Sequence, residues 1–350
     1  MKVILDCERM KYPFTGLYEY CYQLGSALQE YLDKDSLSYY IPEKEINVFG
    51  DQYTYYQRKS SHKILPPMKM DADIWHSVFQ TTKFMKGKNN LKKVLTIHDL
   101  NFLYEKSFAD KIEKYKEIVQ KNIDRADYLI AISHFAKQDV LDNLNVKGKP
   151  FDVIYNGCNI FNFEGFEGPL IYKPEKPFLF FIGNVIPKKN VHVLPCLLKG
   201  NDYELVISGI ENAAYKEKIL EEAKRWNVED RVKITGPISI KEKYWYFKNC
   251  LAFMFPSLAE GFGLPPIEAM HFGKPVFLSM RTSLPEVGGD VAYYFDNFEP
   301  EHMQAVFEAS MNDYFANTKE KEQALIARSE LFSWRKCAAD HFRVYNSLTK

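Results

Sequence analysis

Residues 255–270 read FPSLAEGFGLPPIEAM and join the end of a strand, a glycine turn and the start of a helix. The apolar run 251–255 has the length and composition of a buried strand, and a turn with two glycines follows it. Pro265 and Pro266 suit the first turn of a helix, which needs no backbone N–H donor. A strand that leads directly into a helix is the repeating unit of a parallel α/β sheet, so this stretch indicates the fold class.

Short apolar runs alternate with longer amphipathic stretches on both sides of this segment. The predicted strands are 2–5, 46–49, 74–75, 94–97, 128–132, 151–154, 178–182, 204–207, 232–234, 251–255, 276–278 and 292–295. The predicted helices are 18–31, 110–125, 135–144, 190–198, 213–226, 241–247, 267–272 and a final helix from Trp334. Ser133 and Ser333 are predicted N-caps.

The stretch 161–177 interrupts this alternation, because it contains two glycines and three prolines without periodicity. We interpret it as the linker between two α/β domains, 1–165 and 166–333, with a helix over 334–350 that crosses back to the first domain. Each domain is predicted to be doubly wound and Rossmann-like. Ligands of such sheets bind beyond the carboxyl ends of the strands, so we expect the site in a deep cleft between the domains.

Composition excludes several classes of protein. With 350 residues, 46% hydrophobic and 26% charged, the chain is too apolar to be mainly disordered and long enough for two cores. Lys+Arg 46 equal Asp+Glu 46, so no net charge favours a nucleic-acid partner. The six cysteines are scattered without a C-x-x-C pair, which indicates free thiols in a reducing compartment. The N-terminal apolar run is too short for a signal peptide, so we predict a cytoplasmic protein.

Two carboxylates, Glu260 and Glu268, flank the glycine turn. The backbone N–H groups of Gly263 and Leu264 would point out of the N-terminus of the next helix, an arrangement that holds phosphate. The alternative is a simple strand–turn–helix connection with solvent-facing glutamates, and spacing alone leaves both interpretations open.

The stretch from Glu260 to Val276 resembles the E-x7-E signature of the retaining glycosyltransferases of family 4 almost position by position. Further segments resemble the same family in the expected order: 96–100, 154–157, 182–190, 283–289 and 332–334. The resemblance spans nearly the whole chain. It implies the two-domain GT-B fold, in which the first domain binds the acceptor and the second binds a nucleotide-sugar donor.

The resemblance also implies roles for the residues around the signature. Glu268 would bind the ribose hydroxyls of the donor, because a carboxylate can accept hydrogen bonds from both hydroxyls of a diol. Glu260 would lie at the donor sugar. The amides of Phe262, Gly263 and Leu264 would approach the sugar and the diphosphate, and a side chain at Gly263 would block that approach.

A second cluster, Gly183 to Asn190, follows a predicted strand. Lys189 resembles the family lysine that neutralises the donor diphosphate, where leaving-group charge develops. The family often has an arginine where this chain has Asn184 or Lys188, and Lys188 could replace it only as a point charge. Two solvated lysines are the alternative, although cations are disfavoured at a helix N-terminus.

Two candidates lie in the first half. Gly16 resembles the family glycine that lets the backbone approach donor phosphate and acceptor, and His98 resembles the histidine that contacts the donor sugar. Without the resemblance, a loop glycine such as Gly16 more often marks a turn, and a histidine at the end of a strand, such as His98, is more often a core or capping residue. His76 is a weaker candidate, and Asp99 is predicted to be a turn residue.

We predict neither a metal nor another cofactor. The D-x-D triplets 33–35 and 71–73 lie outside the donor half, and a lysine can supply the same electrostatic stabilisation as a metal. The stretch 83–93 has five lysines and no acid. It is either a solvated loop or a peripheral contact with the inner face of the membrane, with Phe84 and Met85 inserted among lipids.

The resemblance implies a retaining, metal-independent glycosyltransferase. It would move a hexose, with mannose or glucose favoured, from a GDP- or UDP-sugar to a hydroxyl of a glycan or lipid-linked glycan, in the synthesis of cell-surface polysaccharide or lipopolysaccharide. The alternatives are a GT-B-type nucleotide-sugar epimerase or phosphorylase, and a catalytically inactive nucleotide-sugar-binding module.

Overall fold

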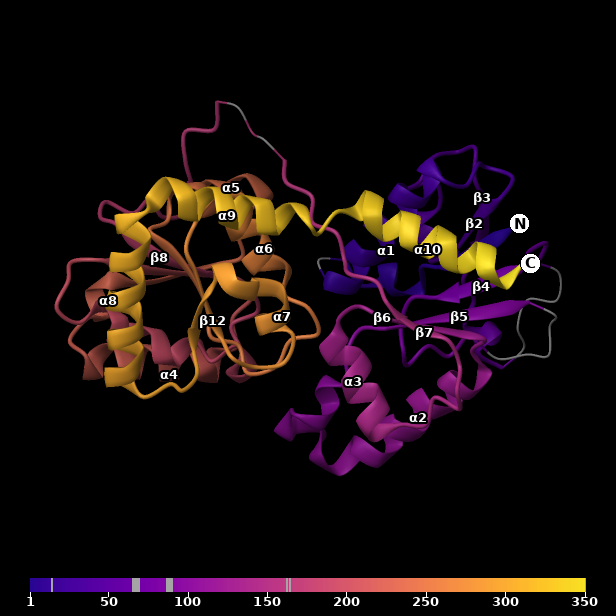
Figure 1. The fold of residues 1–350 in the computed structure, drawn as a ribbon, viewed down its shortest axis with the longest axis horizontal. Helices are drawn as coiled ribbons and strands as arrows, with labels where there is room; N and C mark the ends of the chain where they lie inside the picture. Colours follow the sequence, from indigo (N-terminus) through magenta and orange to yellow (C-terminus); the bar gives the residue numbers. More distant parts are fainter. Residues whose placement is uncertain (14, 65–69, 86–90, 162, 164, 350) are drawn as a thin grey trace. The chain divides into compact units, whose positions relative to one another are not determined.

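The computed structural model describes residues 1–13, 15–64, 70–85, 91–161, 163 and 165–349. These residues form two compact units, one of Met1–Gly157 with Phe332–Lys350 and one of Cys158–Leu331 (Figure 1). Each unit has its own parallel sheet and its own apolar core. The predicted pair of doubly wound, Rossmann-like sheets is therefore confirmed.

The first unit is built on a seven-stranded sheet in the order β3-β2-β1-β4-β5-β6-β7. Its strands are β1 (Val3–Asp6), β2 (Leu37–Ile41), β3 (Thr54–Gln57), β4 (Ile74–Ser77), β5 (Lys92–Ile97), β6 (Tyr128–Ala131) and β7 (Phe151–Val153). The helices are α1 (Gly16–Ala27), α2 (Ile112–Arg125), α3 (His134–Asn143) and α10 (Trp334–Leu348). In Figure 1, α2 and α3 cover one face of the sheet, and α1 and α10 cover the other. The strand order reverses between β1 and β4, which is where doubly wound sheets bind ligands.

The C-terminal helix α10 belongs to the first unit. Ser333 caps it by accepting a hydrogen bond from the Lys336 N–H at 3.2 Å, so the predicted cap is present. Its apolar face packs against α1, and the hydroxyl of Tyr345 lies 2.7 Å from Nδ1 of His76 on β4. A Cβ at Gly157 would lie 2.1 Å from the backbone nitrogen of Trp334, so only glycine fits beside the start of this helix.

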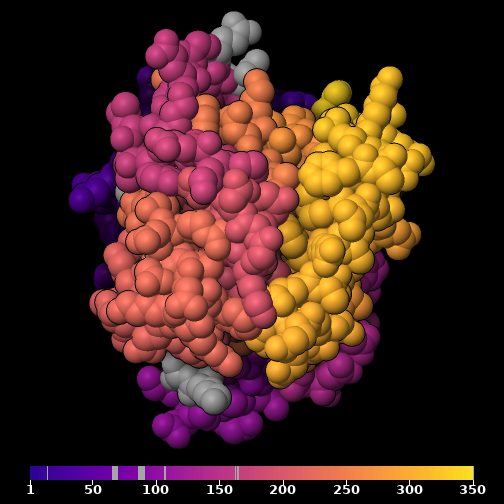
Figure 2. Space-filling view, turned by 90° about the vertical axis from the view of Figure 1, so that its left-hand side faces the viewer, coloured from indigo at the N-terminus to yellow at the C-terminus, as the bar shows by residue number. Residues whose placement is uncertain are grey.

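The second unit has a six-stranded sheet in the order β10-β9-β8-β11-β12-β13. Its strands are β8 (Phe178–Ile182), β9 (Glu204–Ser208), β10 (Val232–Gly236), β11 (Ala252–Phe255), β12 (Val276–Ser279) and β13 (Tyr293–Phe295). Its α-helices are α4 (Ala213–Arg225), α5 (Ile240–Asn249), α6 (Leu264–His271), α7 (Leu284–Gly288), α8 (Pro300–Ala316) and α9 (Thr318–Glu330). Figure 2 shows the face on which α8 and α9 (yellow) lie. Here the strand order reverses between β8 and β11.

Several predicted elements differ from the structure. Residues 46–49 form a turn instead of a strand, because Phe49 packs its ring on Tyr39 with 4.0 Å between the centroids. The predicted helix 190–198 is a 3-10 helix over Val191–Leu198, and Pro195 lies inside it. Strands β2 and β3 and helices α7, α8 and α9 were not predicted.

The predicted domain boundary at residue 165 falls inside the second unit, which begins at Cys158. Ile160 and Phe163 pack against the core of that unit, and the Tyr244 hydroxyl donates a hydrogen bond to the Asn159 carbonyl at 2.9 Å. Residues just after Gly157 therefore already belong to the second core, despite their loop-like composition.

The lysine-rich stretch 83–93 does not expose the apolar side chains expected to enter a membrane. Phe84 and Met85 are 7% and 1% exposed and lie in the core of the first unit, where Phe84 packs near the ring of Tyr40. The predicted insertion of these two residues is therefore wrong, while Lys86 and Lys88 lie outside the described residues. In the part of the chain that the structure describes, no helix combines the length and apolarity needed to cross a membrane.

Candidate functional site

Two glycines, Gly183 after β8 and Gly209 after β9, let the ends of these neighbouring strands approach closely. The Gly183 N–H donates to the Ser208 carbonyl at 3.0 Å, and Gly183 has φ of 154°. Gly209 has φ of 135°, and a Cβ there would lie 1.9 Å from the Gly183 oxygen. No side chain fits at residue 209 without moving the backbone of the Gly183 loop, which leads to Lys189.

The centre of the site is an ion pair between Lys189 and Glu260, residues that follow β8 and β11 respectively. The Lys189 ammonium contacts Glu260 Oε1, and the Ser257 hydroxyl donates to the same oxygen. The ammonium also lies 4.9 Å from the centroid of the Phe255 ring. Both charged side chains are largely buried, 14% and 13% exposed. The pair thus forms where the strand order reverses, the position expected for a ligand site.

Backbone contacts hold the Glu260 turn in place. The Leu258 N–H donates to the Lys188 carbonyl at 2.8 Å, which ties this turn to the loop after β8. The Glu260 N–H donates to the Thr282 hydroxyl at 2.9 Å, and the Ser283 hydroxyl donates to the carbonyls of Glu260 and Phe262 at 3.0 and 2.8 Å. Sequence reasoning missed Ser257, Thr282 and Ser283 as site residues, although 283–289 was noted as family-like.

The start of α6 requires glycine at position 263. Gly263 has φ of 121°, and a Cβ would lie 3.0 Å from Cδ2 of Leu284. The Phe262 side chain is only 4% exposed, so it packs inward, and Leu264 opens the helix.

Glu268, on α6, pairs with Lys243 on α5, at 2.5 Å between Oε1 and Nζ. The Glu268 side chain is 11% exposed. Because neither Glu260 nor Glu268 faces solvent, the alternative of two solvated glutamates is wrong. Lys243 was missed because the sequence gives no sign that its turn of α5 meets α6. The neighbouring Cys158 thiol has its pKa raised well above the usual value, mainly by burial and secondarily by the Glu268 charge.

The remaining residues of the loop differ in their exposure. Asn184 is exposed and Lys188 is partly buried. Asn190 adopts a left-handed conformation, with φ of 57°, and is 5% exposed. Within the described residues its side-chain Nδ2 has no hydrogen-bond partner, so a buried donor that the sequence did not single out lies next to Lys189.

In the first unit, His98 follows β5 and is 8% exposed. Its Nε2 lies 2.9 Å from the Val78 carbonyl, which can only accept, so Nε2 carries the hydrogen and Nδ1 remains an acceptor. Burial lowers the pKa of His98 to about 4, so the ring is neutral near pH 7. Gly16 is the first residue of α1 instead of a loop residue, since Thr15 caps the helix by accepting from the Tyr18 N–H.

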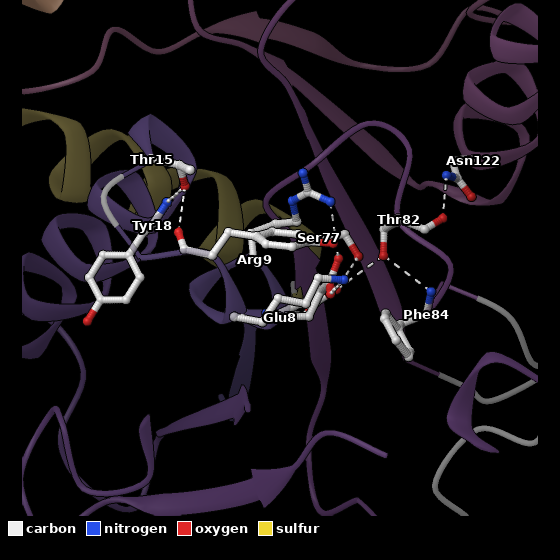
Figure 3. A network of polar contacts seen from close by, with 11 residues as sticks. Glu8, Arg9, Thr15, Tyr18, Ser77, Thr82, Phe84 and Asn122 are labelled. Atoms are coloured by element: carbon white, nitrogen blue, oxygen red, sulfur yellow. Dashed lines mark hydrogen bonds and ion pairs between the residues drawn. The ribbon is translucent and has the colours of Figure 1, made fainter. Parts of the chain in front are cut away.

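A polar network lies at the carboxyl ends of β1 and β4 in the same unit (Figure 3). Asp6 accepts hydrogen bonds from the hydroxyls of Ser77 and Thr82, each at 3.3 Å, and burial raises its pKa to about 8. Glu8 pairs with Lys11 at 3.1 Å, and the Arg9 guanidinium carbon lies 4.2 Å from the centroid of the Phe79 ring. Sequence reasoning missed this network because its members come from separate segments.

Buried histidines make the first unit sensitive to acid. Burial lowers the pKa of His98 and His341 to about 4, and that of His76 well below the usual 6.5. As the pH drops below about 6.5, each of these histidines takes up a proton in the unfolded chain but stays neutral in the folded unit. The free energy of unfolding therefore decreases as the pH decreases. Asp6 has the opposite effect on the free energy of unfolding. Its raised pKa keeps it protonated in the folded unit at a pH where it is ionised in the unfolded chain, so this contribution grows as the pH decreases. We expect the free energy of unfolding of the first unit to decrease by at least about 2 kcal/mol between pH 6.5 and about 4.5.

Hydrogen exchange of the β1 and β5 amides would measure this loss within the first unit. His341→Gln should flatten the pH dependence, whereas the exposed His134→Gln on α3 should leave it unchanged. Equal slopes for both variants would contradict the assignment.

The described residues contain no group of three or more His, Cys, Asp or Glu side chains placed to hold a metal ion. Asp71 of one D-x-D triplet pairs with Lys2, and Asp73 accepts from the Lys2 N–H at 2.7 Å.

Two family models match the chain in succession. "Glycosyltransferase Family 4" matches residues 51–160, and "Glycosyl transferases group 1" matches residues 167–330. O-antigen chain mannosyltransferase B of Escherichia coli is 22% identical over 99% of this chain and 100% of its own length.

Solved structures show the same fold. A sucrose-phosphate synthase from Thermosynechococcus elongatus superposes with a TM-score of 0.77 and 17% identity, over 100% of this chain and 99% of its own. Anabaena HepE, solved in complex with UDP and glucose, has a TM-score of 0.70 and 14% identity, over 99% and 100% of the two chains. With both domain models matched in order and the two sheets in place, the chain belongs to glycosyltransferase family 4, has the GT-B fold and is similar to mannosyltransferases.

Proposed function

We propose that the protein is a retaining glycosyltransferase that moves a hexose, mannose in the first instance, from a GDP- or UDP-sugar to a hydroxyl of a glycan or lipid-linked glycan. The mannosyltransferase relative acts, by its name, on O-antigen chains, which favours mannose and a role in cell-surface polysaccharide or lipopolysaccharide synthesis. The UDP complex of HepE favours a nucleoside-diphosphate donor.

The observation that carries the proposal is the buried pair of Lys189 and Glu260 at the switch point of the second sheet. A buried ion pair adds little net stability, because desolvation of both charges offsets their attraction. Polar groups gathered at this position are therefore better explained by a ligand with its own charge and hydroxyls.

In the proposed reaction, each group acts on one part of the donor. Lys189 has three N–H donors and gives one to Glu260, so the others can meet the oxygens of the diphosphate, where negative charge grows as the bond to the sugar breaks. Glu260, oriented by Ser257, would accept hydrogen bonds from the sugar hydroxyls. Glu268, oriented by Lys243, would accept from the two ribose hydroxyls.

Retention would follow from attack of the acceptor hydroxyl on the same face that the diphosphate leaves, with a donor phosphate oxygen taking the proton. No side chain then needs to form a covalent intermediate. Stabilisation of the leaving group by Lys189 would replace a divalent metal in this scheme.

A thermal-shift screen of nucleotide-sugars tests the proposal directly. A donor at about 100 times its Kd should stabilise the protein by about 2.7 kcal/mol, through mass action. We expect the largest shift from GDP-mannose, and at the same concentration Glu268→Ala should be stabilised by only about 0.4 kcal/mol. No shift with any GDP- or UDP-sugar would contradict donor binding, and conversion of a donor without acceptor would indicate an epimerase instead.

A further inference from the structure

A cavity of about 220 Å³ lies in the second unit, and its described lining residues include no member of the Lys189–Glu260 or Lys243–Glu268 pairs. The segment that follows Gly157 (magenta in Figure 2) forms one wall, and α5 forms the other. Its walls are mainly aromatic: Phe161, Phe163 and Phe166 from the segment, Tyr244 and Trp245 from α5, and Phe272 after α6.

Contacts within the unit hold these walls in place. The Tyr244 hydroxyl donates to the Asn159 carbonyl at 2.9 Å, and the ring stacks on Phe163 with 5.9 Å between the centroids. A Cβ at Gly168 would touch the Trp245 ring at 3.4 Å, so the segment lies directly against α5. The aromatic surface is therefore part of the folded unit.

Large apolar side chains project into solvent around the first turn of α5. Leu170 is 95% exposed, Ile171 54%, Ile240 46% and Phe161 46%. The Leu170 N–H donates to Glu242 Oε1 at 3.1 Å, so its backbone is tied to α5 while its side chain stays outside. Scattered exposed apolar residues are ordinary, but a contiguous group of them marks an interaction site.

The charged side chains among the described residues that line the cavity are both lysines. Lys241 and Lys248 line the cavity two helical turns apart, and the Lys241 ammonium lies 5.7 Å from the centroid of the Phe163 ring. None of the described lining residues carries a carboxylate. Glu242 on the same helix is buried, and its carboxylate accepts from the Ser239 and Leu170 N–H groups.

We propose that this surface binds the face of an anionic lipid bilayer. We call it the α5 surface and define it by Phe161, Leu170, Ile171, Ile240, Lys241, Trp245 and Lys248. Protruding aliphatic side chains enter the acyl region, aromatic rings prefer the headgroup level, and lysines pair with anionic headgroups. The combination fits a bilayer better than a folded protein partner, whose interface would be depleted of lysine. The inference does not depend on which sugar is transferred.

Vesicle co-sedimentation tests the α5 surface. The protein should bind phosphatidylcholine vesicles with about one third phosphatidylglycerol, and bind pure phosphatidylcholine at least about tenfold more weakly. Lys241→Glu with Lys248→Glu should weaken binding to the anionic vesicles about tenfold or more, and so should Leu170→Ser with Ile171→Ser. All four side chains lie at the surface, so their replacement should leave the fold intact, which thermal unfolding would check.

A matched control comes from the same unit. Phe315 on α8 is 54% exposed and Lys319 on α9 is exposed, so Phe315→Ser with Lys319→Glu removes the same kinds of groups elsewhere. This variant should bind vesicles as the parent protein does. Equal loss in the control, or no binding of the parent to anionic vesicles, would overturn the proposal, and the second outcome would favour a protein partner.

Fluorescence gives an independent readout of the position of the bilayer. Brominated lipids should quench the emission of Trp245, which lines the cavity, and Trp245→Phe should abolish most of this quenching. Trp226→Phe, at the end of α4, should leave it in place. Quenching that survives Trp245→Phe would overturn the assignment to α5.

Discussion

Replacement of Lys189 with methionine is expected to lower kcat about 100- to 1000-fold, the usual effect of removing one preorganised group that stabilises transition-state charge. The ammonium lies between Glu260 and the ring of Phe255, so it is held in one place and needs no reorganisation as the diphosphate leaves. Donor affinity should fall less, because the charge on the leaving group is greatest in the transition state. Steady-state kinetics with the donor found by thermal shift would measure both effects.

A second effect of this substitution must be separated from catalysis. Methionine would leave the Glu260 carboxylate buried without its cation, which by itself destabilises a protein. Lys189→Met combined with Glu260→Gln removes both charges, so it should recover stability but not turnover. Lys321→Met, which breaks the Lys321–Asp313 pair on the surface of the same unit, is the control and should keep full activity. Recovery of kcat in the double variant would contradict the role given to Lys189.

Replacement of Glu268 with alanine is expected to weaken donor binding about 100-fold, because two hydrogen bonds to a charged acceptor are lost at once. Lys243→Met should weaken binding by about tenfold, since the carboxylate remains but is no longer held by its 2.5 Å contact. Isothermal titration with the nucleoside diphosphate alone isolates this effect, because that compound carries the ribose but lacks the transferred hexose.

Glu222→Ala is the matched control, since Glu222 pairs with Arg225 on α4 at 3.4 Å and has no proposed role. Its affinity should equal that of the parent protein. Unchanged affinity in Glu268→Ala would remove the basis for placing the nucleotide at α6. If the affinity of Glu268→Ala fell for the intact nucleotide-sugar but not for the nucleoside diphosphate, Glu268 would be assigned to the transferred hexose instead of the ribose.

The sequence predicted the central strands well because each is a short apolar run buried on both faces. Phe178–Ile182 is the same in prediction and structure, and the predicted caps Ser133 and Ser333 both accept the expected hydrogen bonds. β2 and β3, rich in tyrosine and near the sheet edge, gave a weaker apolar signal. The run 46–49 is apolar because Phe49 packs on Tyr39, and a local pattern cannot distinguish that contact from strand pairing.

In the candidate site too, residues within local motifs could be predicted, whereas residues brought in by tertiary packing could not. Glu260, Glu268 and Lys189 could be chosen because the motif around each is local, and the structure describes both glutamates as buried and ion-paired. Their partners could not be chosen so readily. Lys243 reaches Glu268 only because α5 packs on α6, and Thr282 reaches Glu260 from the end of β12. Such contacts depend on tertiary packing between segments, for which a single sequence carries no periodic signal.

The place of α10 has a consequence for biosynthesis. The first 157 residues cannot complete their unit until residues 332–350 have left the ribosome, and the whole second unit is translated in between. Until then, the surface of β4 and α1 that receives His341 and Tyr345 stays uncovered. Chains that end at residue 331 and have left the ribosome should therefore hold a finished second unit and an incomplete first one, and that incomplete unit is the part that would engage chaperones.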